Sequence, residues 1–177
     1  SRKAFELQLM EDLRWLGLEW DEGPDGFGGV SYRQSERLSL YAEWMRRLRD
    51  AGAVYPCFCS DERLEALRRE QLGRGEPPRY DGCCRALPPG EADRRAAAGE
   101  RPCWRFALGD EVIVFEDAVR GEQVFPAGTL GDFVLERSDG IPTYLFASAV
   151  DDLMMEITHV VRGEEHVPNT ARQLAIL

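Results

Sequence analysis

Residues 138–170 constrain the fold more than any other stretch, because they combine a turn, a helical pattern and a short β-branched run. Asp139 and Gly140 mark the turn, and residues 144–155 then repeat apolar side chains at helical spacing. Residues 157–161 are β-branched and end at an Arg-Gly pair, after which a further helix is expected. A buried strand between two helices is typical of a doubly wound layer and predicts the α/β class.

The end of this β-branched run is the first candidate for a functional site. Ligands of doubly wound sheets bind beyond the carboxyl ends of the strands, so Arg162 is expected at the mouth of a site. Glu164 and Glu165 would lie beside it, and Tyr144 would reach it from the preceding turn. The guanidinium of Arg162 suits a carboxylate or a phosphate. A surface Arg-Gly turn with solvated acids has the same spacing, so the pattern leaves both interpretations open.

Charge and composition narrow the class of protein. The net charge is −10, from 22 basic and 32 acidic residues, which argues against an extended nucleic-acid surface. Local basic clusters at residues 46–49 and 68–69 remain candidates for such contacts. No apolar run approaches the ~20 residues of a membrane-spanning helix. The odd number of cysteines, 5, indicates reduced thiols in a cytoplasmic protein rather than a disulfide framework.

Periodicity along the chain predicts helices on both sides of a region of short strands. Helical patterns cover residues 2–17, 34–52, 60–72, 89–98 and 144–155, with further helix starts near 163–165 and 168. Antiparallel strands are predicted at residues 103–106, 112–115, 123–125 and 133–135, after an extended piece at 54–59. Gly17 is placed to end the first helix, a glycine-rich loop follows at residues 23–29, and Ser35 and Ser60 are placed to cap helices. We therefore expect an α+β insertion packed against an α/β core.

A cysteine cluster in this insertion is the second candidate site. Cys57 and Cys59 are separated by one residue. Cys84 follows further along the chain, with Cys83 beside it and Tyr80 four residues before it. Thiolates are preferred ligands of structural zinc, although a one-residue gap is tighter than the usual Cys-x2-Cys spacing. Buried, unliganded cysteines fit the same pattern, so zinc and a plain core both stay open.

Several longer motifs, each different from the others, are spread along almost the whole chain. They occupy residues 13–20, 34–37, 78–82, 137–144, 150–152, 157–166 and 169–170. Among them are Asp-Gly-Ile-Pro-Thr-Tyr at 139–144 and Val-Val-Arg-Gly-Glu-Glu-His at 160–166. In content and order these motifs closely resemble bacterial glutamyl-tRNA synthetases.

The resemblance implies a class I synthetase that activates L-glutamate with ATP and transfers it to tRNA(Glu). It implies a Rossmann-type nucleotide-binding core interrupted by an α+β acceptor-binding insertion, the connective peptide. Residues 1–52 would end the first half of the core, 53–136 would form the insertion, and 137–177 would begin the second half. The family's two ATP signatures, of the His-x-Gly-His and Lys-Met-Ser-Lys-Ser types, are absent and are expected outside this sequence. We therefore expect a fragment that is inactive alone.

Site residues follow from the resemblance position by position. It assigns Tyr144, Ser148 and Arg162 to the L-glutamate site. It assigns Glu165 and His166 to contacts with ATP, which would act together with Mg²⁺. No residue of this chain is expected to be a catalytic acid or base, because adenylation is an in-line attack by the substrate's own carboxylate. Positioning and charge stabilisation remain for the protein to supply.

The resemblance also favours one structural Zn²⁺ in the insertion. Many bacterial members have Cys-x-Cys, a gap of matching length and then Cys-x-His, but position 86, where the histidine would stand, is Ala. A related architecture uses Tyr-x3-Cys, a pattern that this chain satisfies. The predicted ligands are therefore Cys57, Cys59, Tyr80 and Cys84, with Cys83 as the alternative to the tyrosine.

The implied partners are the tRNA(Glu) acceptor end, L-glutamate and ATP, for a cytoplasmic monomer without a membrane partner. A second enzyme hypothesis is the shortened glutamyl-queuosine-type paralogue, which attaches glutamate to a modified tRNA base and shares Tyr-x3-Cys. A glutaminyl enzyme is less favoured. A hypothesis from another class is a stand-alone, zinc-stabilised module that binds RNA or protein.

Overall fold

A computed structural model describes residues 3–24 and 32–177 of the chain. The chain divides into two compact units, Ser1–Arg37 and Leu38–Leu177. Most of the glycine-rich loop predicted at residues 23–29 lies outside the described residues.

The first unit is built around helix α1 (Lys3–Trp15). The helix ends at Gly17 as predicted, since Gly17 has a φ of 74° that other residues rarely adopt. The Gly17 amide donates to the Arg14 carbonyl at 2.9 Å, and the Leu18 amide donates to the Leu13 carbonyl at 3.0 Å. These returning amides satisfy carbonyls that the end of a helix leaves without partners.

The apolar stripe predicted for α1 is mostly exposed, and Met10 is its buried member. Residues Gln34–Glu36 form a separate 3₁₀ turn, η1, so Ser35 lies inside this turn instead of capping a longer helix. A bidentate ion pair joins α1 to the segment before η1. The Arg33 guanidinium donates to both carboxylate oxygens of Glu6, at 2.9 and 2.5 Å. This pair lowers the pKa of Glu6.

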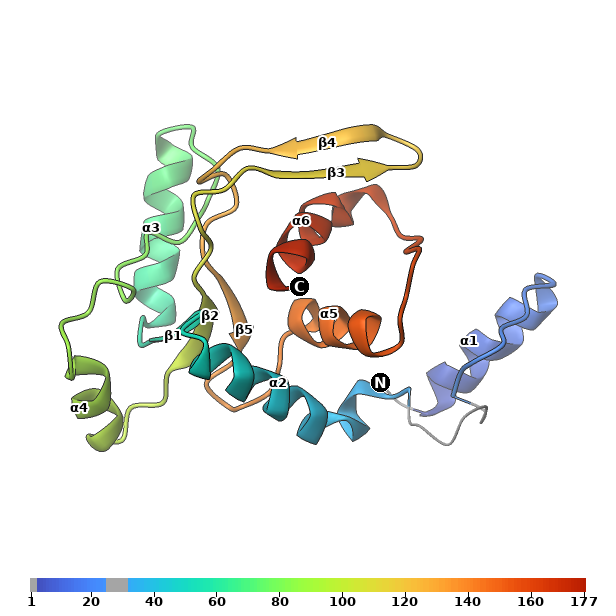
Figure 1. The fold of residues 1–177 in the computed structure, drawn as a ribbon, viewed down its shortest axis with the longest axis horizontal. Coiled ribbons are helices and arrows are strands. Elements are labelled where there is room, and N and C mark those ends of the chain that lie inside the picture. The colour runs from blue at the N-terminus through green and yellow to red at the C-terminus, as the bar shows by residue number, and fades with distance from the viewer. Residues whose placement is uncertain (1–2, 25–31) are drawn as a thin grey trace. The chain divides into compact units, whose positions relative to one another are not determined.

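The second unit contains two small antiparallel sheets (Figure 1). The first sheet has the strand order β1 (Val54–Cys57), β2 (Cys103–Phe106), β5 (Phe133–Glu136). The second is the hairpin of β3 (Ile113–Asp117) and β4 (Gly121–Phe125). The strand segments predicted within residues 53–136 are therefore confirmed, and their ends differ from the predicted ends by no more than the usual uncertainty of about two residues.

The other elements of the second unit are helices. They are α2 (Leu38–Asp50), α3 (Asp61–Gly73), α4 (Glu91–Ala97), α5 (Tyr144–Met154), the 3₁₀ turn η2 (Glu164–His166) and α6 (Val167–Ile176). Of these, α2 and α5 pack on the three-stranded sheet. Ser60 caps α3 as predicted, because its hydroxyl accepts from the Arg63 amide at 3.3 Å. Thr143 caps α5 in the same way, and Pro168 lies in the first turn of α6, where its missing N–H costs nothing.

The strand predicted at residues 157–161 is wrong for this chain. These residues have no strand conformation, and Val161 is 99% exposed. A strand needs a neighbouring strand for its amides and carbonyls, and among the described residues both sheets are antiparallel and leave this run without a partner. The mixed α/β class holds, but the described residues form no parallel, doubly wound sheet.

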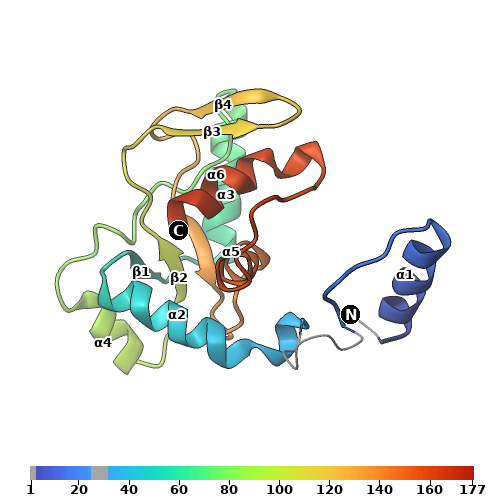
Figure 2. The same cartoon turned by 45° about the vertical axis from the view of Figure 1, so that its right-hand side comes forward.

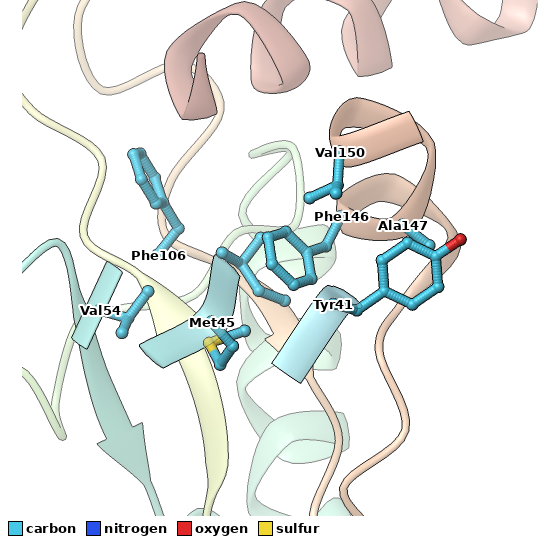
Figure 3. Close-up of a cluster of buried hydrophobic side chains, with 8 residues drawn as sticks. Tyr41, Met45, Val54, Phe106, Phe146, Ala147 and Val150 are labelled. Atoms are coloured by element: carbon cyan, nitrogen blue, oxygen red, sulfur yellow. The ribbon is translucent and has the colours of Figure 1, made fainter. Parts of the chain in front are cut away.

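The hydrophobic core joins the sheet to helices from both sides of the insertion (Figure 3). Its buried residues are Tyr41, Met45, Val54, Phe106, Leu135, Phe146, Ala147 and Val150. Figure 3 shows side chains of α2 and α5 converging on the strands. Segments before, within and after the predicted insertion therefore share one core.

A buried hydroxyl adds a polar link between α2 and α5. Tyr41 is 1% exposed, and its hydroxyl lies 2.9 Å from each carboxylate oxygen of Asp151. A hydrogen bond to a charged group is stronger than one between neutral groups. Asp151 thus has a structural partner across the core.

The hairpin β3–β4 lies beside α6, as Figure 1 and Figure 2 both show. At its turn, Arg120 forms an ion pair with Glu164, the first residue of η2. No helix in the described part of the chain has the length and apolar character needed to cross a bilayer.

The core predicts a large effect of truncating Leu135, whose side chain is fully buried. Leu135→Ala should lower the free energy of unfolding by about 2–5 kcal/mol, because it removes apolar contacts and leaves a cavity. Val119→Ala is the matched control, since Val119 is 93% exposed and should change stability by less than about 0.5 kcal/mol. Urea denaturation checks both variants, and equal losses would contradict this placement of the core.

Candidate functional site

The first candidate site is the thiol cluster, which two adjoining segments bring together. Cys57 is the last residue of β1, and Cys59 lies just before the cap of α3. The loop that follows α3 carries Tyr80, Cys83 and Cys84 back to them.

Polar side chains of α3 hold this returning loop in place. The buried amide of Gln71 bonds the backbone of Arg79 in both directions, at 2.9 and 3.0 Å. Arg63 donates to Asp81 at 2.6 Å, and Asp81 accepts from the Cys83 amide at 3.2 Å. The loop is thus anchored to the helix on both sides of Tyr80.

The sulfur atoms of Cys57, Cys59 and Cys84 all lie within 4.8 Å of one another. The Tyr80 hydroxyl oxygen lies 3.4 Å from the sulfurs of both Cys57 and Cys59, and it accepts from the Cys84 amide at 3.0 Å. The structure therefore brings together the four predicted ligands. Cys83 is a fifth member, with its sulfur 3.4 Å from that of Cys59 and an exposed side chain.

This geometry fits a tetrahedral zinc site. Zn–S bonds of about 2.3 Å in a tetrahedron place sulfurs about 3.8 Å apart, and a zinc-bound oxygen about 3.5 Å from each sulfur. Cys59 and Cys84 have sulfurs 3.6 Å apart, and the tyrosine oxygen is at the expected separation from two sulfurs. All five cysteines are free thiols, so the cluster is available to a metal.

Arg105 supplies positive charge next to this cluster. It is 7% exposed, and its guanidinium lies 3.9 Å from the centre of the Tyr80 ring. No carboxylate forms an ion pair with it within residues 3–24 and 32–177. Hydrogen bonds from Cys103, Tyr80 and Arg105 lower the pKa of Cys57, against the effect of burial. A buried arginine needs a counter-charge, and among the groups around Arg105 the Cys57 side chain is the one that accepts a hydrogen bond from it.

Sequence reasoning did not find Arg105. Its role depends on the register of the sheet, in which Arg105 lies opposite Tyr55 and Cys103 lies opposite Cys57. The signal available in the sequence was weak: an arginine in an apolar strand segment two residues after a cysteine.

The second candidate site is a hydrogen-bonded group that three elements build around Arg162. One terminal nitrogen of Arg162 donates to the side-chain oxygen of Gln173 at 2.7 Å, and the other donates to the Thr170 hydroxyl. The Gln173 amide nitrogen donates to the Ser148 hydroxyl at 2.6 Å. Ser148 lies in α5, Arg162 in the loop after it, and Thr170 and Gln173 in α6. Two predicted site residues, Ser148 and Arg162, are thus joined through a glutamine that sequence reasoning missed.

The other three predicted residues come from the start of α5 and from η2. Tyr144 begins α5 and is 56% exposed, and its ring centre lies 6.3 Å from that of His166. His166 contacts the Asn169 side chain at 3.0 Å, and its other ring nitrogen lies 3.9 Å from a carboxylate oxygen of Glu165. Tyr144, Glu165 and His166 are therefore neighbours, and Tyr144 and Glu165 are exposed.

Asp152 is an acidic residue whose charge interacts with that of Arg162. Burial raises the pKa of Asp152, and the positive charge of Arg162 acts in the opposite direction. Arg162 itself forms no ion pair with a carboxylate in the part of the chain that the structure describes. The group around Arg162 thus presents a cation beside a hydroxyl, an arrangement suited to a carboxylate ligand.

Comparison with known families decides the class. Residues 1–177 match the family model described as tRNA synthetases class I (E and Q), catalytic domain. The chain belongs to this family. The resemblance found in the sequence motifs is therefore confirmed, and the fold is that of a mixed α/β fragment of this catalytic domain.

Relatives of this class I synthetase domain cover its whole length. The chain is 48% identical over 179 residues to glutamate–tRNA ligase 2 of Coxiella burnetii, covering 100% of this chain and 38% of the relative. It is 50% identical to glutamate–tRNA ligase 2 of Syntrophus aciditrophicus, covering 99% and 36% respectively. The chain thus spans little more than a third of the relatives it matches.

A solved structure gives the same result for the fold. The crystal structure of a glutamate tRNA ligase from Elizabethkingia meningosepticum, in complex with its amino acid, superposes with a TM-score of 0.85 at 35% identity. The match covers 96% of this chain and 36% of the other.

Proposed function

We propose that the protein containing this chain is a glutamate–tRNA ligase, which activates L-glutamate with ATP and transfers it to tRNA(Glu). The observation that carries this proposal is the identity of 48% across the whole chain to a glutamate–tRNA ligase. The family match to the catalytic domain over residues 1–177 favours it over a stand-alone binding module.

In this proposal Tyr144, Ser148 and Arg162 bind L-glutamate. The guanidinium of Arg162 pairs with a carboxylate of the substrate, and its charge is free for this because its partners Gln173 and Thr170 are neutral. The exposed hydroxyl of Tyr144 supplies a further donor. Hydrogen bonds to the charged substrate orient it, and orientation is a large part of catalysis in such sites.

Glu165 and His166 contact ATP, which would react as its Mg²⁺ complex. The ring centres of Tyr144 and His166 are 6.3 Å apart. This proximity supports one site that binds glutamate and ATP side by side. The substrate's own carboxylate attacks the nucleotide, so these residues hold and orient reactants. No residue of this chain acts as a catalytic acid or base.

The remainder of the protein would complete the core. The exposed, β-branched run at residues 157–161 has the composition of a parallel strand, and a neighbouring strand from outside this chain would bury it. On this proposal residues 1–52 and 137–177 belong to the two halves of a Rossmann-type core, and residues 53–136 form the acceptor-binding insertion.

The thiol cluster would hold one structural Zn²⁺ through Cys57, Cys59, Tyr80 and Cys84. The metal would tie the loop after α3 to the end of β1 and so shape the insertion that meets the tRNA acceptor end. The whole enzyme would act in the cytoplasm, where its proposed substrates are found. It would act as a monomer with no membrane partner.

One observation favours a second candidate, the paralogue that attaches glutamate to a modified tRNA base. It shares the Tyr-x3-Cys pattern, and here the Tyr80 hydroxyl and the Cys84 amide are in contact at 3.0 Å. The acceptor distinguishes the two enzymes: a ligase loads the 3′ end of an unmodified tRNA transcript, whereas the paralogue does not.

Arg162→Ala in the intact enzyme should raise the KM for glutamate roughly 10- to 100-fold, since a hydrogen bond to a charged group contributes about 1.5–3 kcal/mol. The KM for tRNA should change much less. Steady-state glutamylation of tRNA measures both. Arg94→Ala, at an exposed position of α4, is the control for the glutamate site and should leave the glutamate KM unchanged. An unchanged glutamate KM would remove Arg162 from the pocket.

The metal proposal predicts one zinc per chain in the purified protein. Cys84→Ser and Tyr80→Phe should lower the zinc content measured by plasma mass spectrometry, because each removes a ligand from a four-ligand site. Cys83→Ser is the control and should keep full content. Loss of zinc in Cys83→Ser together with retention in Tyr80→Phe would make Cys83 the fourth ligand instead.

A further inference from the structure

We propose that Gln173 is a positioning residue that holds Arg162 and Ser148 in place while leaving the positive charge of Arg162 unneutralised for a substrate carboxylate. This inference rests on the proposed glutamate site and extends it to substrate specificity. It takes the carboxylate that Arg162 meets to be the side-chain carboxylate of glutamate, which glutamine lacks. It therefore assigns the discrimination between glutamate and its neutral amide, glutamine, in part to Gln173, which holds Arg162 and Ser148 rather than the substrate.

The contacts of Gln173 use both ends of its amide. The side-chain oxygen accepts from Arg162 at 2.7 Å, and the side-chain nitrogen donates to Ser148 at 2.6 Å. Gln173 is 6% exposed, so water does not compete for these bonds. The amide can satisfy both neighbours only in this orientation, because its oxygen accepts and its nitrogen donates.

This arrangement leaves useful hydrogen-bonding capacity on both neighbours. A guanidinium has five N–H groups, and Gln173 and Thr170 use one on each terminal nitrogen. The Ser148 oxygen accepts a hydrogen bond from Gln173. Its hydroxyl donates to the Leu145 carbonyl over a long 3.4 Å, so a ligand can replace that acceptor. Arg162 and Ser148 can therefore both donate toward the same carboxylate.

Gln173 is a neutral partner of Arg162 and therefore leaves the positive charge of Arg162 in place. A glutamate at this position would bind Arg162 equally well in geometric terms but would cancel its charge. Arg162 has only neutral hydrogen-bond partners among the described residues, and no ion pair to Asp152, the acid whose charge interacts with it. A half-buried cation held by neutral acceptors attracts a carboxylate more strongly than an amide.

The test compares two substitutions of similar size in the intact enzyme, Gln173→Glu and Gln173→Met. Both remove the donor to Ser148, but only the first adds a negative charge beside Arg162. Gln173→Glu should raise the glutamate KM at least about tenfold more than Gln173→Met. The added carboxylate neutralises Arg162 and weakens its attraction for the substrate carboxylate, whereas methionine adds no charge. The preference of Gln173→Glu for glutamate over glutamine in kcat/KM should fall, whereas its Tm should not fall below that of Gln173→Met.

Gln71→Glu is the matched control, since Gln71 is equally buried, at 5%, and bonds only the backbone of Arg79. It should lower the Tm and leave the glutamate KM unchanged. Measurements use saturating ATP and tRNA, with the ATP KM determined separately. A Gln173→Glu enzyme whose glutamate KM equals that of Gln173→Met would overturn the proposal. So would a parallel rise in the ATP KM with a drop in Tm, which would indicate a general structural role.

Failure of the proposed function is distinguishable from failure of this inference. A wild-type enzyme that does not glutamylate tRNA rejects the function. Calorimetric titration of the wild-type and Gln173→Glu proteins with L-glutamate then still tests Gln173. Equal affinities would overturn the inference, and weaker binding in Gln173→Glu would support it.

Discussion

Packing of the three-stranded sheet against α2 and α5 is the arrangement on which the second unit depends. A sheet of this size is marginal unless one face is covered, and here the cover comes from helices on either side of the insertion in sequence. Tyr41 and Phe146 are each 1% exposed in the shared core. The contact between Tyr41 and Asp151 joins positions 110 residues apart. Both candidate sites inherit their geometry from this core, since Cys57 ends β1 and Ser148 lies within α5.

The two sites solve a similar electrostatic problem in an acidic chain. Each contains an arginine removed from water to some degree and without a carboxylate partner among the described residues. Arg105 lies against the Tyr80 ring and the Cys57 thiol, and Arg162 bonds neutral oxygens of α6. A buried charge without an opposite charge is costly, so each site is organised to receive or hold an anion. We propose that the anion is a metal-bound thiolate of the cluster for Arg105 and the substrate for Arg162.

On the proposed function, exposed apolar residues are candidates for contacts with the rest of the enzyme. Val161 is 99% exposed and Trp15 is 84% exposed. Large apolar patches on a protein surface usually indicate a contact with another part or partner. The relatives extend well beyond the matched region, which covers 38% of one and 36% of another. The exposed run at residues 157–161 is thus consistent with a strand whose partners lie elsewhere in the protein.

The sequence by itself determined the local elements and the family. Ser60 and Gly17 act at helix ends as their chemistry predicts, and the short strand segments form because alternating apolar residues suit a half-buried sheet. The motifs identified the synthetase family, and the spacing of Cys57, Cys59, Tyr80 and Cys84 predicted a cluster that the structure brings together. These features depend on contacts between neighbours in the chain or on motifs long enough to be specific.

Only the tertiary structure decided the partners of each element. Residues 157–161 have the composition of a strand, but the described part of the chain places no strand beside them. Strand formation depends on a neighbour that local sequence does not specify. Arg105 meets Tyr80 through the register of β1 and β2, and Gln173 links Ser148 to Arg162 because α5 and α6 pack together. Such contacts join residues far apart in sequence, and their geometry exists only after the core has formed.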